Sequence, residues 1–195
     1  MTTASERFHL AIAAIDAANA QDPNRESDDG APKALRYAER MTQTLASLCP
    51  DASDTLKLAA RAQHIKRWVI PRVTYPEGRQ GYHQWRKALY QFHADQAAIV
   101  MREAGYGAEP IATVKSLLCK EGLASNPDMQ ALEDTACLVF LEHYFPAFAQ
   151  QHDEAKVVSI VRKTWKKMSP RGHVAAQLLT FQEREGAMIE KALEA

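Results

Sequence analysis

Helical periodicity is the feature of this sequence that most constrains its fold. Apolar residues recur at intervals of three and four along nearly the whole chain, and no run of β-branched residues alternates with polar ones as a half-buried strand would. A chain of 195 residues with 46% hydrophobic and 25% charged residues is long enough to enclose one core. We therefore predict an all-α fold, a single domain over residues 1–195 built as a bundle of about seven to eight helices.

Prolines, glycines and capping residues give the expected boundaries of these helices. Polar and glycine-containing segments at 24–31 and 71–81 predict loops. Pro32 suits a first helical turn, Asp51 and Ser53 suit helix N-caps, and Asn126 with Pro127 predicts a further helix start. The expected helices are 5–22, 32–49, 51–68, 82–104, 109–119 and 126–144, followed by one helix before and one helix after residues 169–172.

The balance of charge excludes several classes of protein. Lys+Arg and Asp+Glu both number 24, so the net charge predicts neither a general nucleic-acid binder nor a membrane-surface protein. No stretch approaches the ~20 apolar residues that span a bilayer, and the N-terminus does not have the pattern of a signal peptide. We expect a cytoplasmic protein without a membrane partner.

The segment from Lys57 to Lys87 concentrates positive charge. It contains eight cations against the single Glu77, a balance of +7 in a chain of zero net charge. Such a surface attracts phosphate or another polyanion; the alternative is that these cations pair with acids from other segments. The residues expected to bind a phosphorylated substrate are Arg61, Lys66, Arg67, Arg72, Arg79 and Arg86.

Histidines and acids on the predicted helices suggest a second kind of chemistry. His64 lies three residues before Arg67, which places both on one helical face; the alternative is an ordinary solvated basic face. His93 and Asp95 lie within one helical turn and offer nitrogen and oxygen ligands to a metal. The adjacent acids Glu133 and Asp134 stand in an apolar helix, where burial is costly unless a cation or metal meets them.

The order of these residues resembles the HD-domain phosphohydrolase superfamily. The elements of the resemblance are His64-x-x-Arg67, the helix of His93, the Gly105 turn and Pro127-x-x-Gln130-x-Leu132-x-Asp134. It implies an HD-like helical bundle in which His64, His93 and Asp134, with Asp95 or Glu133, hold a divalent metal such as Mn, Fe, Co, Ni or Zn. The metal would activate a water to attack a small phosphate ester or nucleotide, with His83 as the catalytic proton donor.

Two departures from the superfamily pattern leave a second hypothesis open. Ala94 separates His93 from Asp95, where the superfamily has adjacent histidine and aspartate, and Lys120 stands where some members have a further histidine. One outcome is a metal site rearranged around His83 or Glu133. The other is a non-catalytic helical binding domain that uses the surface from Lys57 to Lys87 to hold a nucleotide, RNA or an acidic partner.

A longer resemblance, from about Phe8 to Leu193, is to an uncharacterised family, domain-of-unknown-function family 4202. It is carried by phrases such as Gln-His-Ile-Lys-Arg-Trp from Gln63 and Leu-Glu-Asp-x-Ala-Cys-Leu-Val-Phe from Leu132. Some members of that family are labelled glutamyl-tRNA synthetases, and Lys167-Met168-Ser169-Pro170-Arg171 resembles a signature loop of those enzymes. That loop acts only on a Rossmann sheet, which this sequence does not predict, so we reject the label.

Overall fold

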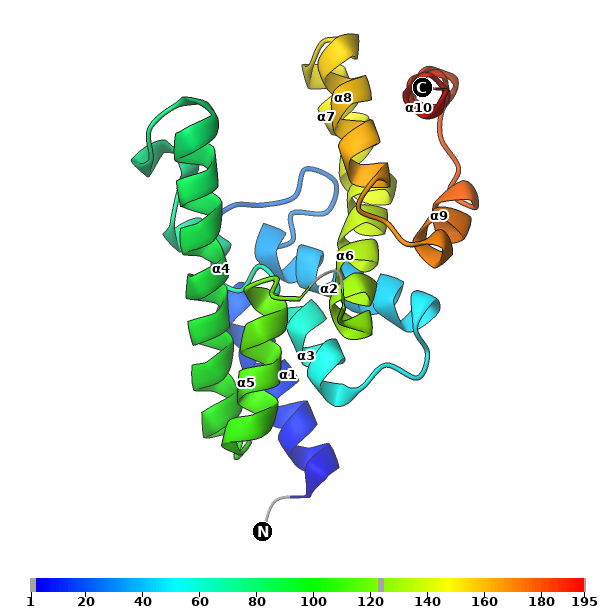
Figure 1. Ribbon diagram of the computed structural model, residues 1–195. Helices are drawn as coiled ribbons and strands as arrows, with labels where there is room; N and C mark the ends of the chain where they lie inside the picture. The colour runs from blue at the N-terminus through cyan, green and yellow to red at the C-terminus, as the bar shows by residue number, and fades with distance from the viewer. Residues whose placement is uncertain (1–2, 123–124, 195) are drawn as a thin grey trace.

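The computed structural model describes residues 3–122 and 125–194, and within these ranges all regular secondary structure elements are helices (Figure 1). An isolated bridge between Arg25 and Pro32 is the sole β-type pairing in the described part. The predicted all-α class is thereby confirmed for these residues. The helices are α1 (Ala4–Asn19), α2 (Lys33–Leu48), α3 (Asp54–Ala62), α4 (Gly78–Glu103), α5 (Ala108–Leu118), α6 (Pro127–Val139), α7 (Phe145–Gln151), α8 (Glu154–Trp165), α9 (Pro170–Gln177) and α10 (Glu183–Leu193).

Short polar side chains begin several of these helices, because they accept hydrogen bonds from backbone N–H groups that have no partner within the helix. The hydroxyl of Ser53 accepts from the N–H of Leu56 at the start of α3, as the sequence predicted for this position. Asn126 caps α6 and is followed by Pro127 in the first turn, which also confirms the predicted start. Asp153 and Ser169 cap α8 and α9 in the same way.

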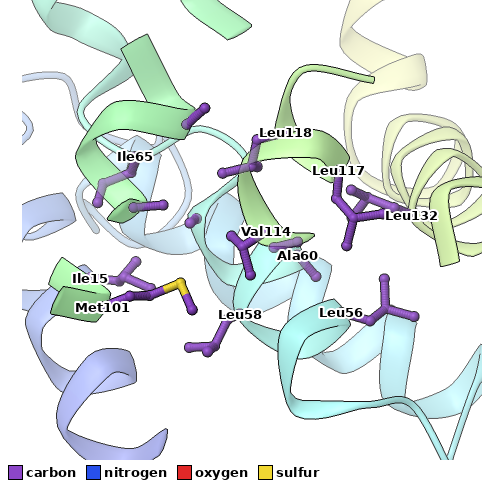
Figure 2. Packing of buried hydrophobic residues seen from close by; sticks show 14 of the residues in the cluster. Ile15, Leu56, Leu58, Ala60, Ile65, Met101, Val114, Leu117, Leu118 and Leu132 are labelled. Carbon is purple, nitrogen blue, oxygen red and sulfur yellow. The ribbon is translucent and has the colours of Figure 1, made fainter. Parts of the chain in front are cut away.

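The largest hydrophobic core is formed by the six helices from α1 through α6. Figure 2 shows Ile15 of α1, Leu58 of α3, Met101 of α4 and Val114 of α5 packed together, and each is at most 1% exposed. Alanines dominate the α3 side of this core, where they allow α3 to lie close to α5. The N-terminal half of α4 projects beyond α1 and α5, as Figure 1 shows, and it is this half that reaches the site described below.

Two smaller clusters hold the C-terminal helices. Phe145 and Val157 pack with Met188, which joins α7 and α8 to α10. Leu48, Leu138 and Met168 form the second cluster, which attaches the segment before α9 to α2 and α6. Figure 1 shows α7 continuing α6 away from the main core and α8 running back toward it, so the end of α8 nearest α9 lies beside α6.

Three predicted boundaries are wrong. Helix α3 ends at Ala62, so His64 lies in a turn, and Arg67 begins a separate 3-10 turn (Arg67–Val69). Helix α4 begins at Gly78, four residues before the predicted start. The predicted helix to Tyr144 changes to a π-helical turn at Phe140, and the described residues contain ten α-helices where about seven to eight were expected.

Gly81 explains how α4 can begin inside a segment with loop-like composition. A Cβ atom at this position would stand 1.9 Å from the carbonyl oxygen of Pro76. Glycine is therefore required by the close approach of the preceding turn, and its presence does not end the helix. Among the described residues, no helix is both long and apolar enough to cross a membrane.

Candidate functional site

A cavity of about 250 Å³ opens between α2, α4, α5, α6 and the end of α8. Its lining includes the buried polar side chains of Gln63, His93 and Glu133. The lining residues are Tyr37, Gln63, His64, Arg67, Tyr82, Arg86, Leu89, Tyr90, His93, Leu117, Leu118, Lys120, Glu133, Ala136, Cys137, Phe140, Thr164 and Lys167. We call this the inner cavity.

The turn after α3 places His64 and Arg67 at the inner cavity. Asn19, fully buried at the end of α1, accepts a hydrogen bond from the backbone N–H of Lys66 at 3.0 Å. This bond stabilises the left-handed conformation of Lys66, with φ of 50°, at the turn between α3 and the 3-10 turn of Arg67. Ile65 meanwhile enters the main core at 0% exposure and anchors the turn from the other side.

His93 is the most deeply buried titratable group of the inner cavity, at 2% exposure. Its Nδ1 lies 2.8 Å from the carbonyl oxygen of Ile65. Since a carbonyl only accepts, Nδ1 carries the proton, and Nε2 is left as an acceptor. That Nε2 is buried and has no hydrogen-bond partner among the described residues. A neutral acceptor is thus available at the wall of the cavity.

Both histidines of the cavity are neutral near pH 7. Burial lowers the pKa of His93 to about 4, and the positive charge of Arg67 acts in the same direction. Burial also lowers the pKa of His64 well below its ordinary value, again with Arg67 as a further cause. The ring of His64 stacks on Tyr37 with centroids 3.9 Å apart, and its centroid lies 5.8 Å from that of His93.

Four cationic side chains surround these histidines. The guanidinium of Arg67 lies over the ring of Trp85, 4.8 Å from the ring centroid. Burial lowers the pKa of Arg67. Arg86 donates to the hydroxyls of Tyr82 and Tyr90. Lys120 and Lys167 approach from the ends of α5 and α8. Among the described lining residues they face one carboxylate, so the formal charge of the cavity is +3 with both histidines neutral.

Glu133 is that carboxylate. It is 4% exposed, forms an ion pair with Lys120, and has a second oxygen 3.5 Å from Nζ of Lys167. Burial would raise its pKa, but the two lysines outweigh burial and hold the pKa below the ordinary value. Lys120 itself has a φ of 60°, an unusual conformation for a residue with a side chain. Glu133 therefore holds two lysines at the cavity wall.

Asp134, the adjacent acid, is bonded to the turn between α8 and α9 and does not line the inner cavity. Its oxygens accept from the N–H and the hydroxyl of Ser169, at 2.8 and 2.5 Å, and from the amide of Gln130 at 2.9 Å. The same amide of Gln130 donates to the carbonyl of Lys167 at 2.9 Å. Asp134 thus fastens the turn between α8 and α9 to α6, which brings Lys167 to the inner cavity.

The remaining predicted site residues lie outside the inner cavity. Asp95 is exposed on the opposite side of α4 from His93, because residues two apart on a helix do not share a face. Its carboxylate forms an ion pair with Lys115. Arg61 makes a bidentate pair with Asp16, at 2.6 and 2.7 Å, within the protein. Predicted residues that line no part of the inner cavity are Arg61, Lys66, Arg72, Arg79, His83, Asp95 and Asp134.

The predicted metal ligands do not form one centre. The structure brings His64 and His93 together, but Asp95 and Asp134 point elsewhere and are bonded to other groups. In residues 3–122 and 125–194, no three His, Cys, Asp or Glu side chains are grouped as a metal site requires. The acid nearest the histidines in the cavity, Glu133, is taken up by two lysines. This donor set does not fit a divalent metal.

Sequence reasoning missed several residues of the cavity. Lys120 and Lys167 lie outside the basic segment and come close only because α5 and α8 both end at the cavity. Tyr37 belongs to a helix that had shown only core periodicity. The one available signal was Glu133, because a buried carboxylate in an apolar helix requires cations that the sequence does not locate.

Comparison with known proteins defines the family of the chain. Residues 9–189 match the model of the family described as Domain of unknown function (DUF4202), and the chain belongs to that family. No curated protein and no solved structure matches the chain.

Proposed function

We propose that this protein binds a small phosphate-bearing molecule in the inner cavity. The observation that carries the proposal is the convergence of Arg67, Arg86, Lys120 and Lys167 on one cavity of about 250 Å³. Arginine and lysine form charge-assisted hydrogen bonds to phosphate oxygens, which are roughly twice as strong as neutral ones. A formal charge of +3, with a single carboxylate among the described lining residues, suits a dianionic group.

The two histidines add to this preference without adding charge. Because His93 is held as the Nδ1–H tautomer, its Nε2 can accept a hydrogen bond from a protonated phosphate oxygen or a hydroxyl. The low pKa values keep both imidazoles neutral at pH 7, so they offer hydrogen-bonding groups and no charge. Arg67, Arg86 and Lys120 are only partly exposed, and their recessed position favours a small molecule over RNA or an acidic protein.

Binding should be tested by isothermal titration calorimetry with inorganic phosphate and with phosphate monoesters. Arg86→Ala should weaken binding by about 10-fold to 100-fold, since a hydrogen bond to a charged group contributes about 1.5–3 kcal/mol. Lys87→Ala is the matched control, because it removes the same charge from the next residue of α4, which is exposed and outside the cavity. Equal losses in the two variants would contradict the proposal.

Hydrolysis of the bound phosphate ester is a second candidate, and the buried acceptor Nε2 of His93 favours it. In this candidate, which keeps the reaction class of the HD-domain resemblance, the cations stabilise charge on the phosphoryl oxygens and His93 accepts a hydrogen bond from the attacking water. Turnover of phosphate esters that is lost in His93→Gln, with phosphate affinity retained, would support this candidate; absence of turnover would leave binding alone.

A further inference from the structure

A second cavity lies directly beside the inner cavity. Its volume is about 820 Å³, and we call it the outer cavity. Tyr37, His64, Arg67, Ala136 and Phe140 line both cavities, so these five residues form their common boundary. Arg67 is the one cation among these five, which gives the two cavities a shared anchor for a negatively charged group.

The sizes of the two cavities suit two parts of one ligand. Pockets for complete small molecules measure about 300–1,000 Å³. The inner cavity, at about 250 Å³, falls below this range and suits a single charged group. The outer cavity, at about 820 Å³, lies within the range and has room for the remainder of the molecule.

Aromatic and apolar side chains define what the outer cavity can hold. Trp68, Trp85 and Tyr144 line it together with Ile70 and Pro71. The indole of Trp85 is fixed in place, because its N–H donates to the carbonyl of Ile70 at 2.9 Å and Arg67 lies against its ring. Such faces stack on flat rings, and stacking of this kind does not depend on one particular ring.

Polar groups line another part of the outer cavity. The carboxylates of Glu26 and Asp28 belong to the loop between α1 and α2, and Arg40 contacts both, at 3.1 and 3.9 Å. Carboxylate oxygens have capacity for several hydrogen bonds, so they can accept from hydroxyl groups in addition to the arginine. The outer cavity thus combines acceptors for hydroxyls with aromatic faces.

We infer that the outer cavity is a second subsite, and that the ligand is a phosphate monoester whose alcohol part carries hydroxyls and a flat ring, as in a nucleoside monophosphate. The phosphate occupies the inner cavity, Arg67 lies between the two parts, and the ring stacks in the outer cavity. This inference rests on the proposed function for the phosphate end. It adds an aromatic subsite formed by Trp68, Trp85 and Tyr144.

The test compares four probes by calorimetry: inorganic phosphate, ribose 5-phosphate, adenosine monophosphate and adenosine. We expect adenosine monophosphate to bind about tenfold or more tightly than ribose 5-phosphate, because one stacked ring is added. We expect adenosine to bind more weakly than either phosphate ester. Trp68→Leu should remove the advantage of adenosine monophosphate and leave phosphate binding unchanged, whereas Trp68→Phe, which keeps an aromatic face, should retain most of it.

The outcomes separate this inference from the proposed function. If ribose 5-phosphate and adenosine monophosphate bind equally well, the aromatic subsite is wrong while phosphate binding stands. If none of the phosphate compounds binds, the proposed function fails and the subsite with it. Should Trp68→Leu not fold, Tyr144→Leu removes another aromatic face of the outer cavity and must give the same selective loss. An unchanged preference in the folded variant would overturn the inference.

Discussion

Protonation of His93 should make the stability of this protein fall steeply in mild acid. The structure holds the pKa of His93 at about 4, against an ordinary value of 6.5. Because the unfolded chain binds the proton more readily, stability is fully present above pH 6.5 and is lost as the pH falls toward 4. One pKa unit corresponds to about 1.4 kcal/mol, so His93 alone contributes a loss of about 3 kcal/mol.

The perturbation that isolates this contribution is His93→Gln. Urea unfolding of the wild type and the variant should be followed at several pH values from 7.5 to 4. The variant is less stable at pH 7, because the bond to Ile65 is altered, but its stability should fall by about 3 kcal/mol less over this range. Comparing the two slopes cancels the protonation of carboxylates, which lowers stability in both proteins.

His9→Gln serves as the control, since His9 is exposed on α1 and does not line the inner cavity. Its pH dependence should match that of the wild type. The same slope in the wild type and in His93→Gln would refute the reasoning, because it would mean that the imidazole of His93 is not held neutral by burial.

Three further predictions follow from single contacts. Gly172→Ala should lower the free energy of unfolding by about 1–3 kcal/mol, because the added Cβ would stand 2.8 Å from the carboxylate of Asp134. Gly186→Ala is the control: the added Cβ would meet no atom within 4 Å, so it should raise the free energy of unfolding by about 0.5–1 kcal/mol. Thermal and urea unfolding of both variants measures these changes. Arg61→Ala should cost about 1–3 kcal/mol of stability and leave phosphate affinity unchanged, and a large loss of affinity in a folded variant would return Arg61 to the site. Glu133→Gln should tighten phosphate binding by about tenfold, because one negative charge leaves the cavity; weaker binding in calorimetry would show that the ion pairs by which Glu133 positions Lys120 and Lys167 outweigh its charge.

The sequence predicted the helical class because the periodicity of apolar residues depends only on local spacing. Helix starts with a capping residue, such as Ser53 and Asn126, were predicted for the same reason. The end of α3 was not predicted, because the turn that follows it depends on a hydrogen bond from the N–H of Lys66 to the side chain of Asn19, 47 residues away. Gly81 misled the prediction of α4, since its function is to allow close approach of Pro76.

The candidate site was predicted in part, and the part that failed depended on direction. His64, Arg67, Arg86, His93 and Glu133 do meet at one cavity. Asp134 was grouped with them on the HD-domain resemblance, but adjacent helical residues point about 100° apart, so Asp134 faces the turn before α9 while Glu133 faces the cavity. The distances between segments decide which cations converge, and periodicity carries no information about them.

A crystal structure of the protein with tungstate, a heavy analogue of phosphate, tests most directly whether the inner cavity is an anion site. We predict one well-occupied anion within hydrogen-bonding distance of Arg67 and Arg86, with Lys120 or Lys167 completing its contacts. An anion bound only elsewhere, for example at the basic groove of Lys163 and Lys166 between α8 and α10, with the inner cavity free of it, would contradict the proposed function.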